Sequence, residues 1–281
     1  TTAWLAATDP LGVEGFLVPA DLDGQRKNSR IRLAAAIDPD DVAQRFAHEI
    51  SEKVSLTWSG DRLVERHERR LGGVSLDAND RRPQPGPPVT AALLKRIGSN
   101  ELRDLPWTKA ASTFRARVEF LHARLGEPWP DWSTKRLVAT AEEWLGPYLA
   151  TATGLDDVAR LDLLQLLRNH LGYPAATEVE GLVPTHVEIP SGRRVAVDYS
   201  GDVPTIAAKV QEFYGATRGP VIAGEPVQLM LLSPADRPIQ ITSDLGGFWA
   251  GSWAEVRKDM AGRYPKHEWP DDPGAASPVR K

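Results

Sequence analysis

The chain has 281 residues, a formal net charge of −4 and 41% hydrophobic residues. It contains no cysteine, which excludes disulfides, thiolate metal sites and cysteine nucleophiles. No run of about 18 apolar residues is present, so no membrane span is predicted, and the mildly acidic balance argues against a dedicated basic DNA-binding module.

Length and composition also set expectations for the size and setting of the protein. A chain of this length can form two or three compact units. The absence of cysteine fits a cytoplasmic protein. The sequence opens with Thr1 and Thr2 rather than Met and with no secretory signal, so we expect a piece of a longer polypeptide.

Residues 1–82 have the pattern of short strands. Apolar runs or alternation over residues 16–18, 30–33 and 54–58 are typical of strands, and the Arg-Leu-Gly-Gly of residues 70–73 indicates a hairpin turn. The first domain is therefore predicted to be rich in strands.

One helix interrupts these strands. Asp38 can cap it, Pro39 suits its first turn, and its predicted buried stripe comprises Val42, Phe46 and Ile50. Short strands broken by a single helix predict a small OB-like β-barrel, although an open antiparallel α+β sheet would have the same pattern. The basic segment 62–70 is interpreted as a solvated strand face.

A linker and a helical domain follow. Residues 81–88, RRPQPGPP, contain four prolines and a glycine and predict a linker. Residues 83–181 are predicted to be helical because their apolar residues recur at spacings of three and four. Thr108 and Ser133 are the predicted caps of two helices. A third helix is indicated by a leucine stripe at Leu161, Leu164, Leu167 and Leu171.

Five cations of this domain could line a polyanion, but the favoured interpretation is that they form the solvated side of leucine-rich helices. They are Arg115, Arg117, Arg124, Lys135 and Arg136.

Residues 182–281 are predicted to form an α+β domain with a mainly antiparallel sheet. Alternating apolar residues on both sides of residues 190–192 indicate a hairpin. A helix is predicted over residues 205–214 and a strand over residues 227–232. The inward face of that helix is predicted to comprise Ile206, Val210 and Phe213.

The most unusual stretch is residues 233–273, in which tryptophans are interleaved with cations. Ser252 and Glu255 have capping-box spacing and predict a short helix that turns Trp253 inward and ends before Gly262. Residues 264–273 contain three prolines, so we expect an extended strap pinned by aromatic rings.

A search for catalytic and metal-binding motifs returns none. The sequence has no phosphate-binding loop of the G-x-x-x-x-G-K-[ST] type, no paired histidines at zinc-ligand spacing and no G-x-S-x-G elbow. No catalytic residue and no metal ligand is therefore predicted, and an independent hydrolase is the least favoured class.

The terminal stretch carries a family resemblance. The segment RYPKHEWPDDP at residues 263–273 resembles the end of bacterial HrpB-type ATP-dependent helicases of the DEAH-box class. The resemblance is strong over residues 184–273 and weaker over residues 4–179. It is carried in order by Phe248, Trp249, Trp253, Tyr264, His267 and Trp269.

The resemblance implies a division of labour within a longer protein. The two RecA-like motor lobes, which would bind ATP and magnesium, are expected upstream of this chain. No cofactor is expected in these residues, and the chain is expected to be inactive alone. Its implied role is to guide single-stranded RNA or DNA and to dock on the motor lobes. The alternative is a protein-interaction module that binds the motor domains or another partner through an aromatic surface.

Two interpretations of the terminal aromatic and basic residues stay open. In the first, cations contact phosphates while a tryptophan stacks on bases. The residues predicted for this role are Arg257, Lys258, Arg263, Lys266, His267 and Trp269. In the second, favoured because large rings prefer burial, aromatic residues seal a seam between domains. The residues predicted for that seam are Phe248, Trp249, Trp253 and Tyr264.

Overall fold

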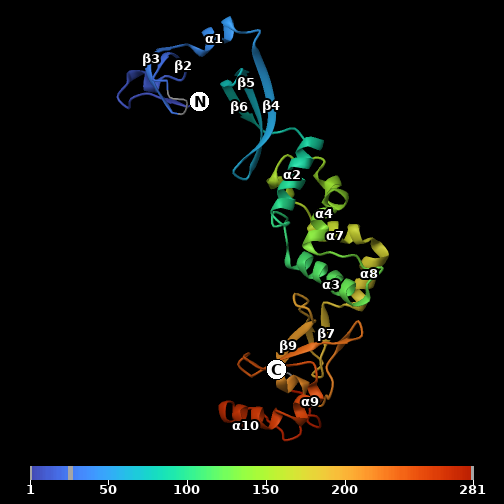
Figure 1. Ribbon diagram of the computed structural model, residues 1–281. Helices are drawn as coiled ribbons and strands as arrows, with labels where there is room; N and C mark the ends of the chain where they lie inside the picture. The colour runs from blue at the N-terminus through green and yellow to red at the C-terminus, as the bar shows by residue number, and fades with distance from the viewer. Residues whose placement is uncertain (1, 25–27, 280–281) are drawn as a thin grey trace. The chain divides into compact units, whose positions relative to one another are not determined.

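The computed structural model describes residues 2–24 and 28–279 and divides into two compact units (Figure 1). Unit 1 is Thr1–Val89 and unit 2 is Thr90–Lys281. The three domains predicted at residues 1–82, 83–181 and 182–281 stay a prediction. In the described parts of the chain, none of the helices has both the length and the apolar character needed to span a bilayer.

Unit 1 is built from two three-stranded sheets and one short α-helix. In the first sheet the strand order is β1-β3-β2, with β1 parallel and β2 antiparallel to β3. In the second, β4, β5 and β6 form an antiparallel meander. The elements are β1 (Ala3–Trp4), β2 (Leu17–Leu22), β3 (Ser29–Ala36), α1 (Pro39–Arg45), β4 (Ile50–Ser59), β5 (Arg62–Leu71) and β6 (Val74–Arg81).

The predicted OB-like barrel is not confirmed. A barrel requires its first and last strands to pair, whereas in the described residues each sheet is open, with β4 and β6 as edges of the second. Two local predictions are confirmed. Asp38 caps α1 by accepting a hydrogen bond from the Asp40 backbone amide. The turn at residues 70–73 joins β5 to β6, where Leu71 pairs with Val74.

Unit 1 has little core for its size. Within its described residues, the buried aliphatic side chains are Val42, Leu63 and Val89. Many large apolar side chains are instead exposed to solvent. They are Trp4, Val13, Val18, Leu22, Leu33, Phe46, Val54 and Val74.

Unit 2 begins with a helical part, as predicted. Its helices are α2 (Pro87–Ser99), α3 (Lys109–Leu125), α4 (Thr134–Ala139), α5 (Ala141–Trp144), α6 (Leu155–Val158), α7 (Leu163–Leu171) and α8 (Tyr173–Leu182). Both predicted caps are confirmed, since Thr108 accepts from the Ala111 amide and Ser133 from the Arg136 amide.

The packing face of α7 differs from the predicted leucine stripe. The helix is capped by Asp162 and buries Leu163, Leu166 and Leu167. Leu161 precedes the helix, and Leu171 is only partly buried. The leucine-rich run permits more than one apolar face, and the position of the cap sets which one turns inward.

The C-terminal part of unit 2 combines small sheets with two helices. Its strands are β7 (His186–Glu188), β8 (Arg194–Ala196), β9 (Thr205–Lys209), β10 (Val221–Ile222), β11 (Glu225–Pro226), β12 (Gln228–Leu232) and β13 (Pro238–Thr242). The helices are α9 (Leu245–Ala250) and α10 (Trp253–Arg263). The predicted hairpin across residues 190–192 is confirmed as β7–β8.

The helix predicted over residues 205–214 is wrong. Residues 205–209 form β9, which pairs in parallel with β12, and a 3-10 turn follows at Val210–Phe213. The largest sheet here, β13-β12-β9, is therefore mixed, whereas the two smaller ones are antiparallel. The predicted buried residues Ile206, Val210 and Phe213 are nevertheless all buried.

The predicted capping box before α10 does not form. The backbone of Ser252 is already helical and its side chain makes no capping hydrogen bond. Gly262 lies inside the helix rather than after it. A side-chain cap is found earlier, where Asp244 accepts a hydrogen bond from the Gly247 amide and begins α9.

Candidate nucleic-acid interface

Residues 264–273, here called the terminal strap, lie against the C-terminal part of unit 2. The strap contains neither helix nor strand, as its prolines predicted. Its carbonyl groups accept from side chains, since Trp253 Nε1 donates to Pro270 O at 2.9 Å and Tyr214 Oη donates to Glu268 O at 3.2 Å. Its last carbonyl, that of Pro273, accepts from the Gly215 amide at 2.9 Å. The strap is thus fixed by hydrogen bonds along its length.

Five aromatic rings, one of which belongs to the strap itself, form a cluster. Neighbouring ring centroids lie 4.9 to 6.2 Å apart, mostly at edge-to-face angles. The five are Tyr214, Phe248, Trp249, Trp253 and Trp269.

This cluster leaves little ring surface for a ligand. Trp253 is 1% exposed and Phe248 is 4% exposed. The indole N–H of Trp249 donates to Ala216 O and that of Trp269 to Tyr264 O. Of the aromatic residues singled out from the sequence, Trp249, Trp269 and Tyr264 keep partial exposure.

The cations of the terminal stretch are partly neutralised. Arg257 pairs with Asp271, and Arg263 pairs with Asp259 at 3.0 Å. Lys258 and Lys266 are exposed, and neither has an ion pair within the described residues. The ring of His267 lies edge-on to Tyr264, with centroids 6.3 Å apart. The structure therefore brings Arg257, Trp253 and Trp269 together and leaves two lysines available to phosphates.

A different cation, Arg117 on α3, corrects a sequence-based prediction. Its side chain is 3% exposed, so it does not lie on the solvated side of the helix. The guanidinium donates to Val183 O at 2.5 Å, to Val179 O at 3.1 Å and to Glu180 Oε2 at 2.8 Å. These bonds tie α3 to the end of α8 and lower the pKa of Glu180 below its ordinary value, since the charged carboxylate is favoured.

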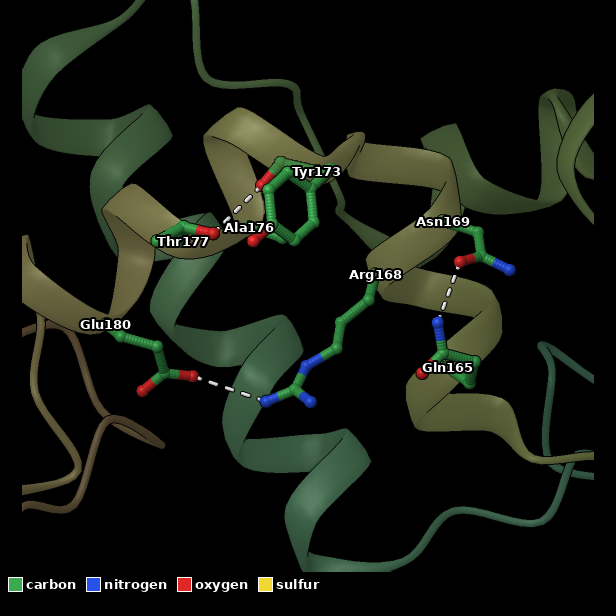
Figure 2. A pocket seen from close by; sticks show the side chains of 7 residues that line it. All are labelled: Gln165, Arg168, Asn169, Tyr173, Ala176, Thr177 and Glu180. Carbon is green, nitrogen blue, oxygen red and sulfur yellow. Dashed lines mark hydrogen bonds and ion pairs between the residues drawn. The ribbon is translucent and has the colours of Figure 1, made fainter.

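Two adjoining cavities lie beside this ion pair. The first, the α7–α8 cavity, has a volume of about 480 Å³ (Figure 2). It is lined by Gln165, Arg168, Asn169, Tyr173, Ala176, Thr177 and Glu180. The second, the α3–β8 cavity, has a volume of about 490 Å³. Its polar lining comprises Lys109, Thr113, Arg117, Arg168, Glu180, Thr185 and His186.

Arg168 and Glu180 belong to both cavities, so the two spaces adjoin. Sequence patterns did not single out Tyr173, Gln165 or Asn169. Tyr173 follows the glycine that ends α7, so its position is typical of an ordinary turn residue. The two amides are common surface residues. Only the packing of α7 against α8 places them around one cavity.

Comparison with known proteins identifies the class. Residues 144–273 match the family described as ATP-dependent helicase C-terminal, and this segment belongs to that family. The predicted resemblance to HrpB-type helicases is thereby confirmed.

One curated relative is the ATP-dependent RNA helicase HrpB of Escherichia coli strain K12. It is 34% identical over 287 residues, which cover 99% of this chain and 36% of the relative. The crystal structure of the E. coli DExH-box NTPase HrpB has a TM-score of 0.66 at 33% identity, covering 99% of this chain and 36% of that one.

A second structure, of the E. coli DEAH/RHA helicase HrpB, has a TM-score of 0.57 at 30% identity, covering 95% of this chain and 34% of that one. The chain thus spans about a third of the length of the relatives that it matches.

Proposed function

We propose that this chain is the accessory C-terminal region of a cytoplasmic ATP-dependent helicase, and that it contacts single-stranded RNA or DNA and docks on the motor lobes. The observation that carries the proposal is the likeness to a helicase along 99% of the chain. ATP, magnesium and strand separation are assigned to the parts of a longer polypeptide that lie outside this sequence.

Docking on the motor lobes is supported by the surface of unit 1. A unit with few buried aliphatic residues gains little stability from its own core, and large exposed apolar surfaces mark interaction sites. Val18 and Leu33, on the paired strands β2 and β3, are 51% and 62% exposed. The alternative function is a protein-interaction module. The exposed apolar surface of unit 1 supports it better than the aromatic cluster of unit 2, because that cluster is mostly buried.

Contact with nucleic acid is supported by the exposed cations of unit 2. Lys258 on α10 and Lys266 in the terminal strap are exposed, and Trp269 of the strap keeps partial exposure. Cations beside an aromatic ring are the usual means of holding a single strand without sequence preference. The remaining arginines of the strap region are paired with carboxylates, so this contact alone would be weak.

Fluorescence anisotropy with the 281-residue chain tests the nucleic-acid role. Labelled single-stranded RNA and DNA should bind at low salt with a Kd on the order of tens of micromolar or tighter, and the Kd should rise steeply as salt is added. Absence of binding by both oligonucleotides at that concentration contradicts the role.

Capture of the motor lobes tests the docking role. The chain should retain the lobes of the longer polypeptide, and Leu33→Glu should weaken retention because it places a charge on the apolar surface of β3. Arg103→Gln, an exposed change in unit 2, serves as the control. Capture of the lobes without any nucleic-acid binding would support the protein-interaction alternative.

A further inference from the structure

Tyr173 is an exposed aromatic residue beside a cavity. Its side chain is 85% exposed although it opens α8, whose N-cap is Gly172. Figure 2 shows its ring at the edge of the α7–α8 cavity, across from Arg168. A tyrosine ring that is not packed against the protein offers its face for stacking, and every nucleobase has a face to match it.

The same cavity holds two side-chain amides. Gln165 Nε2 donates to Asn169 Oδ1 at 2.8 Å, and Asn169 Nδ2 donates to Tyr148 Oη at 3.0 Å. These bonds hold both amides in place and leave the Gln165 carbonyl oxygen without a partner among the described residues. Amides held beside an aromatic face are suited to hydrogen bonds with the edge of an unpaired base.

The charge of the adjoining cavities favours an anion. Glu180 is the only acidic lining residue of either cavity in the described part of the chain, and Arg117 already donates two hydrogen bonds to it. Arg168 Nη2 lies 3.4 Å from Glu180 Oε1, and the Arg168 side chain is 43% exposed, so its charge is only partly neutralised. Lys109 is a second exposed cation of the α3–β8 cavity. Hydrogen bonds and, to a smaller extent, the charge of Lys109 lower the pKa of the nearby Asp198, so Lys109 too is partly neutralised.

A base-stacking ring, amide groups and surplus cations thus lie in cavities joined at Arg168. A nucleotide has the matching parts, since its base is flat and polar at the edge and its phosphate is anionic. The terminal strap matches less well, because Arg257 and Arg263 already have carboxylate partners.

We propose that the α7–α8 and α3–β8 cavities together bind single-stranded nucleic acid, with a base on Tyr173 and phosphate groups at Arg168 and Lys109. This inference rests on the proposed function and names the site at which unit 2 contacts the strand. A free nucleotide has the same chemistry, so the experiment separates the two sources.

Anisotropy with the 281-residue chain and a labelled single-stranded oligonucleotide at low salt is the test. Tyr173→Ala should raise the Kd by roughly 5- to 150-fold, the range found for the loss of one base-stacking ring. Tyr173→Phe keeps the ring and should stay within about twofold of the unchanged chain. Arg168→Gln should raise the Kd and reduce the slope of log K against log salt by about 0.7, as for one lost phosphate contact on a single strand.

The matched control is Arg103→Gln, which removes an exposed arginine elsewhere in unit 2 and should leave the Kd unchanged. A second measurement guards against misfolding. Thermal midpoints should be unchanged for the Tyr173 variants, and the oligonucleotide should slow hydrogen exchange in residues 163–182.

The failures of the two proposals are distinguishable. No binding by the unchanged chain contradicts the proposed function itself. Binding that survives both Tyr173→Ala and Arg168→Gln but is lost in a Lys258→Gln, Lys266→Gln double variant overturns the cavity site and leaves the proposed function intact. Competition by adenosine monophosphate as effective as that of the oligonucleotide would overturn the assignment to a strand.

Discussion

At the scale of residues, Arg117 shows how the surroundings of a charge decide its role. It lies among cations that the sequence assigns to solvent, yet its guanidinium is buried between α3 and the end of α8. Two backbone carbonyls and one carboxylate satisfy its donors. A buried arginine with this many partners is a structural clamp, since an uncompensated charge there would be costly.

The ion pair makes the stability of unit 2 depend on pH. The hydrogen bond from Arg117 lowers the pKa of Glu180 in the folded state. Its stabilisation is therefore fully present above the unfolded pKa of about 4.3 and is lost as the pH falls through the lower folded value.

We expect Glu180→Gln to destabilise the chain by about 1–2 kcal/mol at pH 7, a figure at the low end for bonds to a charged group because Glu180 is half-exposed. The difference should shrink as the pH falls below the unfolded pKa of about 4.3 and through the lower folded pKa, because the carboxylate then becomes protonated. Thermal unfolding across this range measures it. Glu178→Gln, an exposed change on the same helix, is the control, and a pH-independent difference would contradict the linkage.

At the scale of elements, helix caps depend on interactions within a few residues, whereas strand pairing depends on partners far away in the sequence. Thr108 caps α3 as predicted because the bond spans three residues and needs no other element. Residues 205–209 pair with β12, which lies about twenty residues further along. Ile206, Val210 and Phe213 fit a helical face, but Ile206, Ala208 and Val210 fit strand alternation equally well, and the parallel partner decides between them.

Matched cap variants test this distinction. Thr108→Ala should destabilise the chain by about 1 kcal/mol, since it removes the bond to the Ala111 amide. Ser252→Ala, at the start of α10, should change stability by less than about 0.5 kcal/mol because Ser252 makes no capping bond. Denaturant unfolding measures both values. Equal losses in the two variants would show that the capping box forms after all.

At the scale of the whole molecule, the two units differ in how much apolar surface they bury. Unit 2 buries complete aromatic and leucine side chains such as Trp132, Phe114 and Leu121. The described part of unit 1 has thin, open sheets and exposed apolar side chains. Because local stability follows buried apolar contacts, the units should differ in their resistance to opening.

Hydrogen exchange followed by mass spectrometry tests this difference. Peptides from β2 and β3 should exchange faster than peptides from α3 and α7, since their backbone bonds lie over little buried surface. Addition of the motor lobes should slow exchange in unit 1 if they dock there. If, without the motor lobes, unit 1 of the 281-residue chain exchanges as slowly as α3, the prediction is contradicted.

Local chemistry made part of the fold and site predictable. The caps at Asp38, Thr108 and Ser133, the hairpin at residues 70–73 and the proline-rich strap all follow from interactions within a few residues. The barrel in unit 1 is not confirmed, and the helix at residues 205–214 and the solvated position of Arg117 were wrong predictions. Each depends on partners distant in the chain, which pattern alone does not reveal.

The terminal strap shows which features the sequence determines and which depend on tertiary structure. By itself the sequence determined that residues 263–273 carry a family signature and that their prolines exclude helix and strand. The inward position of Trp253 was also predicted from the sequence, but tertiary structure alone decided that its indole donates to Pro270 of the strap and that Arg257 pairs with Asp271. It also placed Tyr173, Arg168 and Lys109 around adjoining cavities, because α3 lies far from α7 and α8 in the sequence and the three helices line these cavities only when they pack together.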